Sequence, residues 1–154
     1  MTVTDVTPKS QTEAISFQYD LDHPPEKVWR ALTDPELLAE WLLPVVDGDL
    51  ELEPGASFEL RAPPQPGWDG AVRCRLREIE AHRKLSYSWV VGDPGGDSLL
   101  DTVVTFTLTP TASGTRLSLE QSGFAPGQKR NFGGARYGWK LMGGRLVELL
   151  ARLP

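Results

Sequence analysis

The side chains that bind metals or act as nucleophiles are few and widely spaced in this sequence. His23, His82 and Cys74 do not follow a spacing typical of zinc sites. Cys74 alternates with Val72 and Leu76, which indicates a small buried apolar residue rather than a reactive thiolate. The sequence also lacks the glycine motifs of nucleotide-binding loops and the G-x-S-x-G motif of a serine nucleophile. We therefore predict no metal, no cofactor and no catalytic residue.

Two polar features leave a chemical role open. Arginine occupies every second position from residue 73 to residue 77, so these side chains share one face of a strand. That face is either exposed to solvent or turned toward a cavity, where an arginine would bind a carboxylate through two hydrogen bonds. His82 is either a turn residue or a general base. We keep Arg75 and His82 as candidate polar contacts of a ligand.

The aromatic residues are the most informative group. Five tryptophans occur in 154 residues: Trp29, Trp41, Trp68, Trp89 and Trp139. Pockets for small molecules are mostly apolar and aromatic, with a few polar groups that fix orientation. We expect Trp29 in the core. Trp41, Trp89 and Trp139 are either core or pocket-wall residues, and Trp68 is either a pocket lid or a loop anchor.

The elements that would position these residues are mostly strands. Apolar residues alternate with polar ones from Ala14 to Leu21, which predicts a half-buried strand. Similar patterns predict strands near residues 49–52, 58–60, 72–77, 85–89, 104–108 and 117–119. Their connections are too short for crossover helices, so the sheet should be antiparallel.

Three helices are expected. Pro24-Pro25-Glu26 begins a short helix that ends near Leu32, and Asp34-Pro35-Glu36 begins a second one. From about Ala135 to Leu153, apolar residues recur at steps of three and four, which predicts one long amphipathic helix. Gly143 and Gly144 lie inside it, and a close approach to the sheet is one explanation for them.

Length and charge exclude several classes of protein. The chain has the size of one domain, with 40% hydrophobic residues and a formal net charge of −5. Residues 123–154 carry six Lys or Arg and one acid, which leaves +5 there and −10 over residues 1–122. This asymmetry indicates a basic C-terminal element that lies on an acidic body, or else a polyanion-binding surface. We expect a cytoplasmic protein, a flexible leader over residues 1–13, and neither nucleic acid nor membrane as a partner.

Six segments together resemble the helix-grip superfamily of START-like (SRPBCC) domains. Within it, the sequence is most similar to the family named for the C-terminal domain of the activator of the 90-kDa heat-shock chaperone ATPase. The matching segments are residues 25–41 (PEKVWRALTDPELLAEW), 84–89 (KLSYSW), 102–106 (TVVTF), 114–117 (GTRL), 122–124 (SGF) and 138–139 (GW). The resemblance implies an α+β fold over residues 14–154, in which a curved antiparallel sheet of six or seven strands wraps around the long C-terminal helix.

The resemblance also implies a cavity between the sheet and that helix. We expect it to bind a small, largely apolar or amphipathic molecule without catalysis, with the loops at residues 62–70, 92–98 and 123–134 at its mouth. The candidate pocket residues are Trp41, Phe58, Trp68, Trp89, Phe106, Phe124, Trp139, Met142 and Leu146.

Two alternatives remain at this stage. One is an enzyme similar to the aromatases and cyclases of the superfamily, acting on a hydrophobic substrate. The other is a protein-interaction module, similar to a co-chaperone, that docks a partner protein or a second copy of itself. Against the co-chaperone role, the eukaryotic activators have a further N-terminal domain, and this chain has only a short polar leader.

Overall fold

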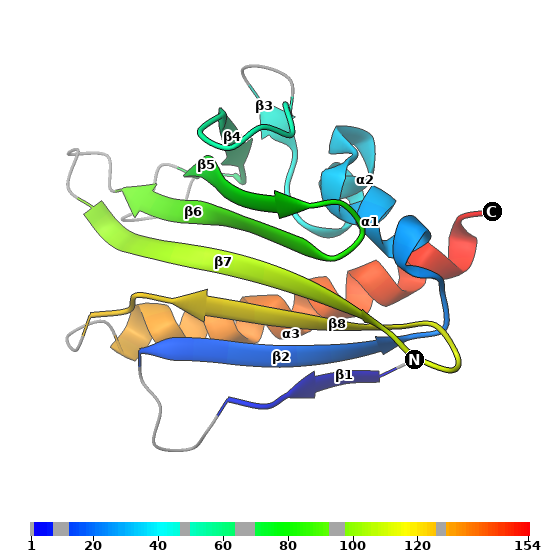
Figure 1. The fold of residues 1–154 in the computed structure, drawn as a ribbon. Helices are drawn as coiled ribbons and strands as arrows, with labels where there is room; N and C mark the ends of the chain where they lie inside the picture. Colours follow the sequence, from blue (N-terminus) through cyan, green and yellow to red (C-terminus); the bar gives the residue numbers. More distant parts are fainter. Residues whose placement is uncertain (1, 8–12, 47–49, 64–69, 93–97, 126–128) are drawn as a thin grey trace.

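The computed structural model describes residues 2–7, 13–46, 50–63, 70–92, 98–125 and 129–154. In chain order its elements are β1 (Thr2–Asp5), β2 (Ala14–Leu21), α1 (Pro25–Thr33), α2 (Pro35–Trp41), β3 (Val45–Val46), β4 (Ser57–Arg61), β5 (Ala71–Glu80), β6 (Lys84–Gly92), β7 (Ser98–Pro110), β8 (Thr115–Ser122) and α3 (Lys129–Arg152). Figure 1 shows the sheet curving around α3.

The strands form one antiparallel sheet in the order β1-β2-β8-β7-β6-β5-β4-β3. From β3 to β8, each strand pairs with the next one in the chain, as short connections require. The pair of β2 and β8 joins the beginning of the domain to its end, with Phe17 opposite Leu119. The predicted antiparallel helix-grip architecture is therefore confirmed.

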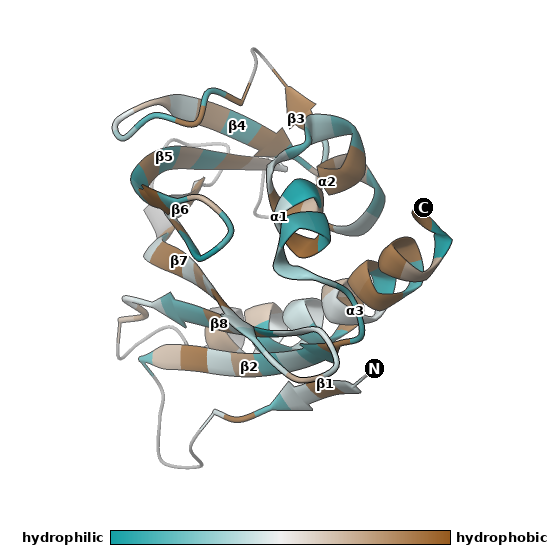
Figure 2. Ribbon diagram, turned by 45° about the vertical axis from the view of Figure 1, so that its right-hand side comes forward, coloured by the Kyte–Doolittle hydropathy of each residue, from teal (hydrophilic) through white to brown (hydrophobic). Residues whose placement is uncertain are grey.

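Alternation along the strands separates a buried face from an outer face. On β2, the four side chains of Ile15, Phe17, Tyr19 and Leu21 are all buried, and the residues between them are partly exposed. The same period of two holds along β8. Figure 2 shows that the three helices lie on one side of the sheet, which is the buried side. We call this side the concave face.

The short helices begin where the prolines predict. Pro25 and Pro35 occupy first-turn positions, where a missing N–H costs no helical hydrogen bond. At α2, the backbone N–H of Glu36 donates to Oδ1 of Asp34 at 3.0 Å, so Asp34 caps the helix. Trp29 and Trp41 then point into the core from the buried sides of α1 and α2.

The long helix α3 seals the concave face. Trp139, Leu146, Leu149 and Leu150 are each no more than 1% exposed. A Cβ atom at Gly143 would lie 2.5 Å from Cε1 of Tyr19, so this glycine permits a close approach between α3 and β2. The neighbouring Gly144 meets nothing within 4 Å, so the same explanation does not extend to it.

Several boundaries differ from the predictions. Residues 2–5 of the expected leader form the edge strand β1, which pairs with β2 and packs Val3 against the core. Residues 50–52 are not in a strand, and β3 lies earlier, at Val45–Val46. The backbone of α3 begins at Lys129 rather than near Ala135. With β1 and β3, the described sheet has eight strands, where six or seven were expected.

Candidate functional site

Aromatic side chains from β4, β6, β7, α2 and α3 meet between the concave face and the helices. Their ring centroids lie 5.1 Å apart for Phe58–Tyr87, 5.5 Å for Trp89–Trp139, 6.0 Å for Phe106–Trp139, and 6.2 Å for both Trp41–Phe106 and Tyr87–Phe106. All five pairs are edge-to-face or tilted, and edge-to-face is a favoured geometry of aromatic contacts. We call these six residues the aromatic cluster.

A buried chain of hydrogen bonds ties α3 to the sheet beside this cluster. The indole N–H of Trp139 donates to Oε1 of Gln121 at 2.7 Å, and Nε2 of Gln121 donates to Oγ1 of Thr102 at 2.9 Å. The Thr102 hydroxyl in turn donates to the carbonyl of Trp89 at 2.8 Å. Gln121 and Thr102 are each 1% exposed, so this chain fixes where Trp139 lies on the sheet.

Sequence reasoning missed Gln121 and Thr102. The sequence does contain a signal for both residues, because the alternation of apolar and polar residues places Gln121 and Thr102 on the concave face. Gln121 continues the buried series of Leu117 and Leu119, and Thr102 precedes Val104. A polar residue in such a series needs a hydrogen-bonding partner in the interior.

The interior is apolar and electrically neutral. Burial raises the pKa of the Cys74 thiol and of the Tyr87 hydroxyl well above their usual values, so both stay protonated at neutral pH. Among the described residues, no Asp, Glu, Lys, Arg or His is buried. Such an interior suits neutral ligands and offers no ionised nucleophile.

Most of the predicted pocket residues lie together. Trp41, Phe58, Trp89, Phe106, Phe124, Trp139 and Leu146 are buried in one core, and Met142 is partly buried against it. Phe124 lies near the start of α3, with its ring 5.2 Å from that of Phe132. Trp68 lies outside the described residues, as do residues 64–69 and 93–97 of two loops expected at the mouth. Of the third expected loop, residues 126–128 lie outside the described residues, and residues 129–134 belong to α3, so the expectation of a loop there is wrong.

The two candidate polar contacts lie elsewhere. Arg75 is exposed on the outer face of β5, where its Nε donates to the carbonyl of Gly55 at 3.2 Å. His82 is exposed in the turn between β5 and β6, with a positive φ of 65°. The structure therefore favours the solvent-face and turn interpretations of these residues, and it does not bring them to the aromatic cluster.

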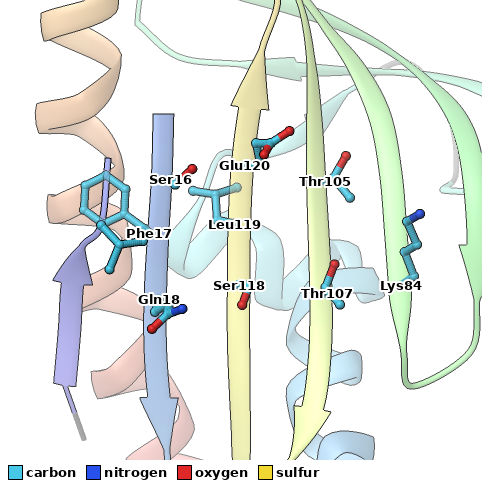
Figure 3. A pocket seen from close by; sticks show the side chains of 10 residues that line it. Ser16, Phe17, Gln18, Lys84, Thr105, Thr107, Ser118, Leu119 and Glu120 are labelled. Atoms are coloured by element: carbon cyan, nitrogen blue, oxygen red, sulfur yellow. The ribbon is translucent and has the colours of Figure 1, made fainter. Parts of the chain in front are cut away.

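Two hollows lie on the outer face of the sheet. One, of about 590 Å³, crosses β2, β8, β7 and β6, and Figure 3 shows Gln18, Ser118, Thr107 and Lys84 along it. The other, of about 510 Å³, lies over β4, β5 and β6. Their many polar side chains are typical of the solvent side of an antiparallel sheet, so we assign no ligand to them.

Two further properties of the described chain bear on function. Within the described ranges, no three His, Cys, Asp or Glu side chains group as a metal site would require. None of the helices there is long and apolar enough to cross a membrane.

Comparison with known proteins identifies the family. The model of the family "Activator of Hsp90 ATPase homolog 1-like protein" matches residues 22–151. The chain belongs to this family. The match confirms the relationship that the sequence segments indicated. None of the curated proteins matches the chain.

Solved structures of bacterial proteins share the fold. Protein MLL2253 from Mesorhizobium loti is 42% identical, with a TM-score of 0.80, and the match covers 92% of this chain and 98% of that one. Protein CV1439 from Chromobacterium violaceum is 26% identical, with a TM-score of 0.71, and the match covers 90% of this chain and 98% of that one. DynU16, a putative protein in the dynemicin biosynthetic locus, is 23% identical, with a TM-score of 0.72, and the match covers 92% of this chain and 48% of that one. This likeness shows the fold alone.

Proposed function

We propose that this protein binds a small, largely apolar molecule between the concave face and α3, without catalysing a reaction. The observation that carries the proposal is the aromatic cluster, in which rings from five separate elements converge on one neutral interior. Affinity would come from burying apolar area, at about 25 cal/mol per Å² before the costs of ordering.

Several features support a binder over the alternatives. The neutral, protonated state of Cys74 and Tyr87 supplies no nucleophile or general base at neutral pH. The net charge of −5 disfavours nucleic acid as a partner. We place the protein in the cytoplasm as part of the same proposal, with a small molecule rather than a membrane as its partner.

A thermal-melt screen tests this proposal. The panel contains lipids, flavonoids, sterols and neutral aromatic compounds, each added to the purified full-length protein. A ligand at 100 times its dissociation constant stabilises by about 2.7 kcal/mol, which shifts the melting temperature of a domain of this size by roughly 5–10 °C. Native mass spectrometry of the same preparation looks for a small molecule that co-purifies.

A matched pair of variants locates the binding site. Met142→Trp adds bulk on the partly buried side of α3 and should abolish the shift. Leu141→Trp adds a similar bulky side chain to α3 at a position where the native side chain is 45% exposed. It should leave the ligand-induced shift in melting temperature intact. A shift that survives both substitutions would place the ligand elsewhere. A flat screen together with no co-purifying molecule would favour the protein-interaction module.

A further inference from the structure

A partly buried histidine joins three elements of the fold at the C-terminal end of α3. His23 lies in the short segment between β2 and α1. Its Nδ1 is 3.1 Å from Nζ of Lys27, in the first turn of α1, and the same Nζ donates to the carbonyl of Leu153 at 2.8 Å. Leu153 directly follows α3 and packs against the core. Figure 1 shows α1 beside this end of α3, and the contacts through Lys27 link the two helices to the end of β2.

These hydrogen bonds define the protonation state of the His23 ring. A lysine ammonium group donates hydrogen bonds and accepts none, so Nδ1 of His23 must be the acceptor. The ring is therefore neutral and carries its proton on Nε2. Among the described residues, this Nε2 is the one buried side-chain nitrogen or oxygen without a hydrogen-bonding partner. The bond to Lys27 thus forms although it leaves a buried N–H unpaired, which costs free energy.

A second proton on the ring is incompatible with this arrangement. It would bind at Nδ1, which would then donate and could no longer accept from Lys27. It would also place a positive charge beside the Lys27 ammonium, whose nitrogen is 3.1 Å from Nδ1. Burial, and then the charge of Lys27, lower the pKa of His23 below its usual value of 6.5, while the charge of Asp22 opposes them with a smaller effect.

The groups around His23 show which part of the site can move. Among the described residues, Lys27 and Asp22 are the charged groups that act on the ring. From β8, the uncharged Thr115 donates its hydroxyl proton to the His23 carbonyl at 2.8 Å, and α3 contributes the backbone carbonyl that Lys27 binds. A Cβ atom at Gly114 would lie 2.6 Å from the His23 nitrogen, so the backbone is also closely packed there. The histidine is therefore held in place, whereas Lys27 has a long flexible side chain.

We propose that His23, Lys27 and Leu153 form a proton-sensitive latch, which holds the C-terminal end of α3 against α1 and opens when His23 is protonated. When the two positive charges repel, Lys27 turns toward solvent, and its bond to the Leu153 carbonyl is lost. Carbonyls at the end of a helix have no partner inside the helix, so this end of α3 loses a cap. The latch is independent of the identity of any ligand and is tested on the free protein.

The extent and the sign of the pH effect follow from the structure. Leu149 and Leu150 are buried in the core, so the opening is confined to the last turn of α3. The unfolded chain binds a proton at His23 near pH 6.5, and the folded chain binds it only at lower pH. The stability that the latch contributes is therefore complete above about pH 6.5 and is lost as the pH falls through the folded pKa.

Nuclear magnetic resonance of the full-length protein tests the proton sensor. At about pH 8, long-range ¹H–¹⁵N correlations of the His23 ring should show the tautomer that is protonated at Nε2, and titration should give a pKa below 6.5. Lys27→Met removes the ammonium group and should raise the pKa of His23. Lys140→Met is the matched control, because it removes a positive charge at an exposed position of α3. It should leave the titration of His23 unchanged.

Hydrogen exchange at the end of α3 tests the opening. The backbone N–H of Leu153 donates to the carbonyl of Leu149 at 3.1 Å, so its protection reports on the last turn. After correction for intrinsic rates, protection should fall about fivefold from one pH unit above the measured pKa of His23 to one unit below it, as for the loss of one hydrogen bond. In Lys27→Met, protection should be low at both pH values. His23→Asn keeps an acceptor on Cγ but does not titrate, so protection should stay high at both.

Several results would overturn the latch. One is a pKa of His23 at or above 6.5, and another is an equal change of this pKa in Lys27→Met and Lys140→Met. If His23 titrates as expected while protection at Leu153 stays constant, the ring does not hold α3 and the latch is wrong. An equal loss of protection in His23→Asn and the wild type would assign the effect of acid to another group and would exclude the latch as well. The proposed ligand pocket stands or falls by its own screen.

Discussion

Gly143 and Gly144 are adjacent in α3 but have different surroundings, and the contrast tests how closely the helix lies on the sheet. A Cβ atom at position 143 would lie 2.5 Å from Cε1 of Tyr19 and 3.0 Å from Cγ1 of Val3. A Cβ atom at position 144 would meet nothing within 4 Å. Replacement of either glycine by alanine gains about 0.8–1.0 kcal/mol of helix propensity, so the difference between the variants reports the contact alone.

The contact at position 143 should outweigh the gain in propensity. To restore an ordinary separation of 3.4 Å, the Tyr19 ring and α3 would have to separate by roughly 0.9 Å. Tyr19 is 0% exposed, and its hydroxyl bonds the carbonyl of Trp139, so the ring has little room to move. Overpacking of a core costs about 1–3 kcal/mol. Because the added Cβ atom would contact a fully buried ring, we expect a cost of about 3 kcal/mol at position 143. We expect Gly143→Ala to destabilise by about 2 kcal/mol and Gly144→Ala to stabilise by about 1 kcal/mol.

Urea denaturation of the wild type and both variants, followed by tryptophan fluorescence, measures these changes. If the free energy of unfolding depends on urea concentration with the same slope in all three proteins, the urea concentration at the midpoint should rise for Gly144→Ala and fall for Gly143→Ala. Coincident midpoints for the two variants would show that α3 does not lie against Tyr19 as described. A rise for both would show that propensity alone governs this part of the helix.

Two further predictions concern polar contacts of α3. Gln121→Leu leaves the buried indole N–H of Trp139 without its acceptor, so chemical denaturation should show a loss of about 1–3 kcal/mol, and an unchanged stability would contradict the inferred role of the buried chain. Burial tends to raise the pKa of Asp5, but hydrogen bonds from Thr7 and Arg136 lower it below its usual value of 3.8. The stability that this depressed pKa supplies is present above about pH 4 and is lost as the pH falls through the folded pKa. Arg136→Gln should therefore be less stable than the wild type at pH 7, by less than about 1 kcal/mol because the pair is partly exposed. The two curves of stability against pH should converge as the pH falls through the folded pKa of Asp5.

The sequence was sufficient to predict the fold because its local signals agree with one another. The alternation from Ile15 to Leu21 predicts β2, and the structure has a strand there. The prolines at positions 25 and 35 predict the starts of α1 and α2, which begin at these residues. Strand β1 was missed because its four residues form an edge strand with one partner, so their pattern is too short to detect.

The charge asymmetry was interpreted partly correctly. Two basic side chains of α3 contact acids of the body, since Arg136 pairs with Asp5 and Nη2 of Arg152 lies 3.9 Å from Oε1 of Glu40. These contacts are consistent with a basic helix that lies on an acidic body. Lys140 and Arg145 are exposed, so part of the positive charge faces away from the body.

The candidate site was less predictable than the fold, for a physical reason. Periodicity assigns a residue to a face but does not say which of its neighbours will satisfy its polar atoms. Alternation places Gln121 on the concave face, but only the structure shows that it completes a chain of hydrogen bonds from Trp139 to Thr102. The sequence pattern alone does not distinguish a polar group that holds the fold together from one that does not.

This distinction also explains why family membership leaves the ligand undetermined. The paired groups, such as Trp139 with Gln121, fix how α3 lies on the sheet, and any change there costs stability whatever the protein binds. Residues outside this frame can vary with less effect on folding, and a shared fold does not fix what a protein binds. Members of one family can therefore keep the same frame and recognise different molecules.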